Sequence, residues 1–80
     1  MPQENFDQEL GRILASHRRK LGISQEFLSS SLRRDQTHVS KVETGKRSMT
    51  VEDFLRWSKA LNLDNGTVIE TLSKLKSHVE

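Results

Sequence analysis

The chain has 80 residues, a formal net charge of +2 and no cysteine. A chain of this length forms one small domain rather than a multi-domain enzyme, and without cysteine it has neither a disulfide framework nor a thiolate zinc site. The N-terminal residues lack the pattern of a signal peptide, and no apolar run approaches the roughly 20 residues that cross a bilayer. We therefore expect a single soluble, cytoplasmic domain over residues 1–80.

The charge is distributed unevenly along the chain. Residues 1–11 carry three acids and no base, residues 12–47 carry nine bases and three acids, and residues 48–80 carry four bases and five acids. The central segment, at +6, is typical of one cationic face, although a solvated run of charges would have the same composition.

The first helix is expected to begin after Asn5 as N-cap and to end at Gly22, with Ile23 making the hydrophobic contact of a Schellman motif. Helical spacing recurs from here to the end of the chain, whereas no segment alternates apolar and polar residues as a strand does. The apolar stripe of this helix is Phe6, Leu10, Ile13, Leu14, His17 and Leu21.

Two short helices are expected next. Ser24 is a suitable N-cap for a helix that runs to about Leu32, and Asp35 is a suitable N-cap for a third helix that Gly45 ends. The positions expected to be buried are Leu28, Leu32, Val39 and Val42.

A basic loop then leads to two further helices. Thr50 with Asp53 is expected to cap the fourth helix, and Thr67 with Glu70 to open the fifth, over about residues 66–79. The buried face of the fourth helix is expected to be Val51, Phe54, Trp57, Ser58 and Leu61, and the fifth helix carries Val68, Ile69, Leu72, Leu75 and Val79. The sequence therefore predicts a compact all-α domain of five helices.

The third helix has side chains suited to reading DNA bases. If Val39 and Val42 face inward, helical geometry turns a row of polar side chains outward. Lysine donates to the acceptors of guanine, glutamine pairs bidentately with adenine, and serine and threonine are permissive. The outward residues are Gln36, Thr37, Ser40 and Lys41. This pattern favours insertion of the third helix into a major groove.

Several stretches occur in an order that is more specific than any one of them. They are Leu10-Gly11 with Leu14 and Arg18, then Leu21-Gly22-Ile23-Ser24-Gln25-Glu26 with Leu28, then Val39-Ser40-Lys41-Val42-Glu43-Thr44-Gly45-Lys46-Arg47, and Lys59-Ala60-Leu61-Asn62-Leu63. In these stretches, residues 10–63 resemble the lambda-repressor-like, Cro/repressor-type (XRE-like) helix-turn-helix family. The resemblance implies a five-helix DNA-binding domain with its helix-turn-helix motif at about residues 24–44.

The resemblance also implies roles for individual residues. Arg18 and Glu43 match a partly buried ion pair that holds the first helix to the third. The positions that match base-contacting residues are Gln36, Thr37, Ser40 and Lys41. The positions that match or lie beside phosphate-contacting residues are Gln25, Arg34, His38, Thr44, Lys46 and Arg47.

The turn of the motif departs from the family pattern. Arg33 stands where glycine is usual, and Arg34 stands where a small apolar residue is usual. Arg33 is therefore expected to adopt a left-handed conformation, at a cost on the order of 1 kcal/mol for a residue other than glycine.

The remaining polar residues give no sign of catalysis or of a ligand site. His17 is expected in the core or at its boundary, and His38 at an exposed position where it contacts phosphate or solvent. The histidines are not at metal-ligand spacing, no histidine and acid surround the serines at 29–31, and no glycine-rich phosphate loop is present. We therefore expect no metal, no cofactor, no small-molecule ligand and no enzymatic activity.

Two apolar features leave room for protein partners. Phe27 is expected to pack against the first helix or, alternatively, to contact a partner. Leu72, Leu75 and Val79 are surplus to a five-helix core and favour an isologous homodimer interface. The sequence thus predicts a sequence-specific transcriptional regulator that binds double-stranded DNA as a homodimer on a pseudo-palindromic operator. The alternative is a protein-binding adaptor or antiactivator on the same scaffold.

Overall fold

Five α-helices make up the computed structural model, which describes residues 2–79 and the side chains from residue 6 onward. They are α1 (Pro2–Lys20), α2 (Gln25–Leu32), α3 (Gln36–Glu43), α4 (Val51–Ala60) and α5 (Asn65–Lys76). Residues 2–79 contain no strand. The all-α, five-helix fold expected from the apolar spacing is therefore confirmed.

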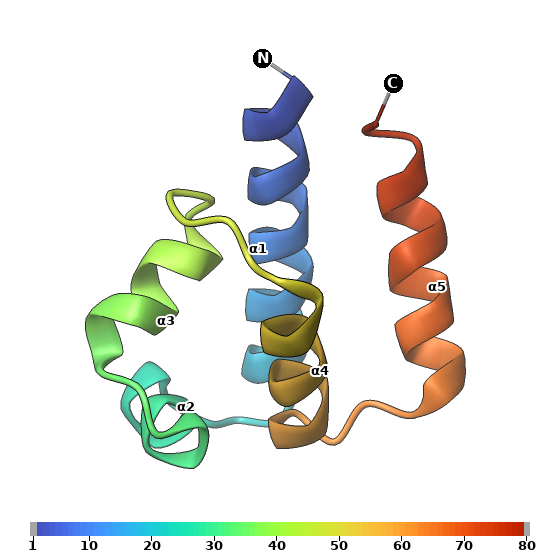
Figure 1. Ribbon diagram of the computed structural model, residues 1–80. Helices are drawn as coiled ribbons and strands as arrows, with labels where there is room; N and C mark the ends of the chain where they lie inside the picture. The colour runs from blue at the N-terminus through green and yellow to red at the C-terminus, as the bar shows by residue number, and fades with distance from the viewer. Residues whose placement is uncertain (1, 80) are drawn as a thin grey trace.

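The longest helix, α1, lies at the centre of the arrangement. Figure 1 shows α2 and α3 on one side of α1 and α5 on the other, with α5 antiparallel to α1 so that both ends of the chain lie at the same end of the molecule. α3 packs against both α1 and α2, and α2 also contacts α4. Within residues 2–79 no helix is both long and apolar enough to cross a membrane.

α1 begins earlier than the sequence predicts. The expected N-cap, Asn5, lies inside the helix, which starts at Pro2. Proline is favoured at the first helical position because its fixed φ suits the helix and its missing N–H would have no intrahelical partner there. At the other end Leu21, expected in the apolar stripe, follows the last helical residue and is exposed.

The other four helices begin with a side-chain cap. The side chains of Ser24, Asp35 and Thr50 accept a hydrogen bond from the backbone N–H three residues later, as predicted. In α5 the prediction is wrong, because the cap is Asp64, which accepts from the Thr67 N–H at 2.7 Å. This bond lowers the pKa of the Asp64 carboxyl, because it favours the charged form.

The first four helices are each followed by a residue with positive φ, namely Gly22, Arg33, Gly45 or Asn62. In each case the N–H groups of that residue and of the next one bond to carbonyls in the last helical turn, which is the Schellman pattern. Arg33 has φ 56° and ψ 42°, so the left-handed conformation predicted for it is confirmed. The chain thus turns from α2 into α3 without a glycine.

The core lies where the apolar faces of all five helices meet. Trp57 is its largest fully buried side chain. The cluster consists of Leu10, Leu14, Leu28, Val39, Val42, Phe54, Trp57, Leu61 and Leu75. Val51, predicted to be buried, is instead exposed at the first position of α4, before that helix reaches the core.

α5 turns a different face to the core from the one predicted. Leu75, expected at an interface, is 3% exposed and belongs to the core, whereas Leu72 is 47% exposed. Thr71 is buried, and its hydroxyl is satisfied because it donates to the Thr67 carbonyl at 2.9 Å. A threonine whose hydroxyl bonds to its own helix fits an apolar environment. Thr71 is therefore buried where the sequence analysis considered Leu72.

α1 and α3 meet at a glycine. A Cβ atom at Gly11 would overlap the carbonyl oxygen of Val42 and lie 2.8 Å from that of Glu43. Just beyond α3, a Cβ atom at Gly45 would lie 2.6 Å from the Gln8 Cγ. The backbone of α1 therefore lies directly against the C-terminal end of α3 and sets the position of α3 in the fold.

Candidate nucleic-acid interface

α2 and α3 pack against each other across the turn, and the outer face of α3 is polar. Val39 and Val42 are fully buried, so the opposite face of α3 is turned to solvent. That face lines a shallow depression between the start of α2 and the loop after α3. The depression brings together residues that the sequence assigned to bases and to phosphates: Gln25, Gln36, Thr37, Ser40, Lys41, Thr44 and Lys46.

The ion pair expected between α1 and α3 is present. Arg18 Nε donates to Glu43 Oε2 at 2.6 Å, and Arg18 Nη2 donates to Glu43 Oε1 at 3.1 Å. A third donor of the same guanidinium bonds to the Ile23 carbonyl at 2.8 Å. The Arg18 side chain is 11% exposed and the Glu43 side chain 4%, so both charges are largely removed from water. A bidentate, buried pair of this kind fixes the orientation of both helices.

The same carboxylate also orients two glutamines on the exposed face. Gln25 Nε2 donates to Glu43 Oε1 at 2.9 Å, and Gln36 Nε2 donates to Gln25 Oε1 at 3.4 Å. A chain of hydrogen bonds thus runs from Arg18 on α1 to Gln36, the first residue of α3. The family resemblance implied the link from Arg18 to Glu43, but the sequence contains no signal for the two glutamine links, whose partners lie 18 and 11 residues apart.

A second, more basic hollow lies beside the first. We call it the basic pocket; it is lined by Arg34, Asp35, Thr37, His38, Lys41 and Arg47. Arg34 also makes an ion pair at 3.4 Å with Asp53 of α4, a partner that the sequence does not indicate. The pocket therefore joins the turn, α3 and the loop after α3 in one cationic surface.

His38 is not at the exposed position that the sequence predicts. It is 7% exposed, and its ring centroid lies 6.3 Å from that of Trp57 at a tilt of 51°. Burial lowers the pKa of His38, and the nearby charges of Arg34 and Arg47 lower it further. The exposed assignment is wrong because the side chain turns toward α4, and its aromatic partner lies 19 residues away in the sequence.

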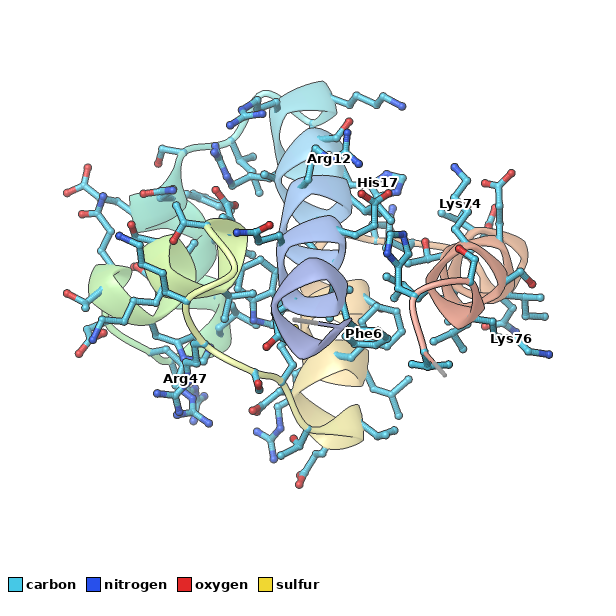
Figure 2. All side chains as sticks on the ribbon, turned by 90° about the horizontal axis from the view of Figure 1, so that it is seen from above. Phe6, Arg12, His17, Arg47, Lys74 and Lys76 are labelled. Carbon is cyan, nitrogen blue, oxygen red and sulfur yellow. The ribbon has the colours of Figure 1, made fainter. Side chains whose placement is uncertain are left out.

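The remaining candidates for phosphate contact lie at the C-terminal end of α3. Thr44 is exposed, and its hydroxyl donates to the Ser40 carbonyl at 2.9 Å. Lys46 and Arg47 are exposed in the loop that follows. In Figure 2, Arg47 projects from the α3 side of the molecule, while Lys74 of α5 lies beyond the opposite side of α1. Basic side chains therefore flank α3 at its C-terminal end.

Two apolar features expected to be packed in the protein or at an interface are placed differently. Phe27 is 60% exposed on α2, so packing against the first helix, the arrangement that the sequence favoured, is wrong. Of the three residues proposed for a dimer interface, Leu75 is excluded because it lies in the core, while Leu72 and Val79 are exposed. Ile69, one turn before Leu72, is also exposed, although the sequence did not assign it to an interface.

His17 is partly buried on α1, and in Figure 2 it lies with Phe6 on the side of α1 that faces α5. The residues that the structure describes contain no group of three or more histidine, aspartate or glutamate side chains that could hold a metal ion.

Comparison with known families agrees with this geometry. A family model described as "Helix-turn-helix domain" matches residues 9–72, which is most of the chain. The match includes all five helices at least in part and contains the whole α2–turn–α3 unit. No curated protein matches the sequence. The helix-turn-helix resemblance seen in the sequence is confirmed.

Proposed function

Because this chain belongs to the helix-turn-helix domain family, we propose that it is a transcriptional regulator that binds specific sequences of double-stranded DNA as a homodimer. In helix-turn-helix domains the second helix of the motif enters the major groove and the first crosses the backbone. Here those helices are α3 and α2. Two α3 helices, related by the dimer axis, would read the two halves of a pseudo-palindromic operator in successive major grooves. The bound dimer would act at a promoter, either by occlusion or by recruitment.

The observation that carries this proposal is the polar face of α3, a helix whose opposite side is packed against the rest of the protein. The valines of α3 are buried, its opposite face presents amide, hydroxyl and ammonium groups, and the Arg18–Glu43 pair attaches the helix to α1. Recognition of base edges needs side chains fixed by a rigid support, because the order of donors and acceptors distinguishes base pairs. The α3 face supports such a role.

Gln36, Thr37, Ser40 and Lys41 are proposed to contact bases. The Gln36 amide offers a donor and an acceptor, which is the pairing that adenine presents in the major groove, and the Lys41 ammonium suits the acceptors of guanine. Gln25, bonded to both Glu43 and Gln36, would position Gln36 while it contacts a phosphate from the start of α2. The other phosphate contacts would come from Arg34, His38, Thr44, Lys46 and Arg47.

Lys41→Ala is expected to weaken binding to the cognate operator by about 1–3 kcal/mol and to relax the preference at one base position. Binding to unrelated DNA should weaken much less, because most of that affinity comes from phosphate contacts. Competition binding on the cognate and on a scrambled duplex measures both effects. Lys74→Ala is the matched control, since it removes the same charge from α5 on the far side of α1 (Figure 2). Equal losses on both duplexes would show that Lys41 does not read bases.

Lys46→Ala and Arg47→Ala are expected to weaken binding to every duplex alike. Each should also flatten the dependence of log K on log salt concentration by about one, because a variant that neutralises one phosphate fewer releases one counterion fewer on binding. A salt series on the wild-type protein and on each variant gives these slopes. An unchanged slope for either variant would remove that residue from the set of phosphate contacts.

The homodimer is proposed to form through the exposed apolar residues of the C-terminal region, Ile69, Leu72 and Val79. They leave an apolar surface on the described chain that an isologous contact would cover. We expect sedimentation equilibrium to give a dimer at tens of micromolar, and Leu72→Asp to give a monomer of unchanged helicity. Leu55→Asp, at an exposed leucine on α4, is the control and should leave the dimer intact. A wild-type monomer at that concentration would end this part of the proposal.

The proposed function as a whole is tested by a gel shift on the DNA upstream of the chain's own gene, across a salt series. Preferential, salt-dependent retardation is expected. A second function is favoured by one observation, the exposed Phe27 on α2: a protein-binding adaptor that uses the same scaffold. No preference for any DNA, together with a co-purifying protein whose binding is lost in Phe27→Ala, would favour the adaptor.

A further inference from the structure

The basic pocket has the composition of an anion site. Arg34, Lys41 and Arg47 bring positive charge to it from the turn, from α3 and from the loop after α3. Among the described residues neither Lys41 nor Arg47 has an ion-pair partner, and Arg34 uses one guanidinium nitrogen for Asp53 and keeps its other donors. Asp35, the one acid in the lining, is already engaged as the N-cap that accepts from the His38 N–H at 2.9 Å.

His38 lies in the wall of this pocket with an unusual hydrogen-bonding state. The residue is more than nine-tenths buried, and its Nδ1 is fully buried without a hydrogen-bond partner among the described residues. Nε2 is not enclosed in this way, so it is the ring nitrogen that a ligand in the pocket can reach. His38 therefore adds one reachable imidazole nitrogen to a hollow that is already lined by Arg34, Lys41 and Arg47.

Burial and the neighbouring charges lower the pKa of His38 in the free protein. Desolvation lowers its pKa most, followed by repulsion from Arg34 and Arg47, and these effects outweigh the attraction of Asp53 and Asp35. Lys41, on α3 itself, adds further positive charge to the pocket wall. A phosphate group placed between the two arginines would reverse this balance, because its negative charge offsets their repulsion and stabilises an imidazolium ring.

We propose that the basic pocket binds one backbone phosphate of DNA and that His38 takes up a proton from solvent as the phosphate enters, donating from Nε2 to a phosphate oxygen. This inference rests on the proposed DNA-binding function and adds proton linkage to it. Because the complex holds one more proton than the free protein, DNA binding becomes tighter as the pH falls through the range in which His38 titrates.

The first test measures binding to a fluorescein-labelled duplex of random sequence, by anisotropy at constant ionic strength from about pH 8 to about pH 5.5. A random duplex suffices because the proposed partner of His38 is a phosphate. We expect the affinity of the wild-type protein to rise by about threefold to tenfold over this range, and most of the rise to be absent in His38→Gln. His78→Gln is the matched control, because it removes a histidine beyond the end of α5 and should keep the rise.

The outcomes separate the inference from the function on which it rests. If His38→Gln binds the duplex with the same pH dependence as the wild-type protein, the proton linkage is refuted and DNA binding stands. If the wild-type protein binds no duplex at any pH in low salt, the proposed function itself fails. Circular dichroism of His38→Gln establishes that it is folded before the comparison is made.

A measurement on the wild-type protein avoids dependence on that variant. The ring Cε1–H resonance of His38, assigned from its absence in His38→Gln or from proximity to Trp57, is titrated by NMR with and without the duplex. We expect the duplex to raise the proton affinity of His38 by about tenfold, and that of His78 by much less. A rise no larger than that of His78 would overturn the proposal, whatever the behaviour of the variant.

Discussion

Glu43→Ala is expected to lower the free energy of unfolding by about 3–5 kcal/mol. The substitution leaves the guanidinium of Arg18 enclosed, with two of its donors unpaired, and removing one partner of a buried ion pair is far more costly than removing a surface one. Small domains are stable by only about 5–15 kcal/mol, so a substantial fraction of the variant should be unfolded at elevated temperature. Urea titration followed by circular dichroism gives the loss directly.

The control for this loss is Glu52→Ala. Glu52 pairs with Arg56 one turn later on α4, and both side chains are largely exposed. Water screens exposed pairs of this kind, so the control should change the urea midpoint little. Replacing both Arg18 and Glu43 by leucine should recover most of the stability lost in Glu43→Ala, because no uncompensated charge then remains in the interior. A midpoint for Glu43→Ala equal to that of Glu52→Ala would mean that the Arg18–Glu43 pair does not hold α1 to α3.

Most features set by local chemistry were predictable from the sequence, although the starts of α1 and α5 were not. A cap such as Ser24 or Asp35 acts within three residues, and a Schellman motif such as that at Gly22 acts within six, so short windows of sequence contain both partners. The left-handed conformation of Arg33 was expected because Arg33 stands where the helix-turn-helix family usually has glycine. The outward face of α3 followed from the spacing of two valines within one helix.

Features that depend on how a helix packs against the other helices were not predictable in this way. The apolar spacing of α5 fits more than one rotation about its axis, and the choice between Leu72 and Leu75 as the buried leucine depends on how α5 meets α1. Thr71 was overlooked because its burial depends on a hydroxyl bond within the helix rather than on its apolar character. His38 was assigned to the exposed surface because its partner, Trp57, comes from another helix.

Gly11→Ala is expected to destabilise the fold by about 3 kcal/mol, the upper end of the range for overpacked interiors. In the middle of a helix this change normally stabilises by up to about 1 kcal/mol, because alanine has the higher helix propensity. The sign reverses here because the new methyl group meets the carbonyl oxygens of Val42 and Glu43, which are backbone atoms and cannot rotate away. α1 and α3 must then separate.

The separation of α1 from α3 makes this variant informative about function as well as stability. Gly11 lies two turns before Arg18 on α1, so moving the helix off α3 also pulls the guanidinium away from Glu43, and with it the chain of hydrogen bonds to Gln25 and Gln36. Urea titration should therefore show a lower midpoint, and the fraction that remains folded should bind DNA more weakly. Gly66→Ala is the matched control: the nearest atom to its new methyl group is 3.6 Å away, so it should be neutral or stabilise by about 0.5 kcal/mol. If Gly11→Ala instead raised the midpoint as Gly66→Ala does, α1 could not lie on the carbonyls that end α3, and the support proposed for the recognition face would be wrong.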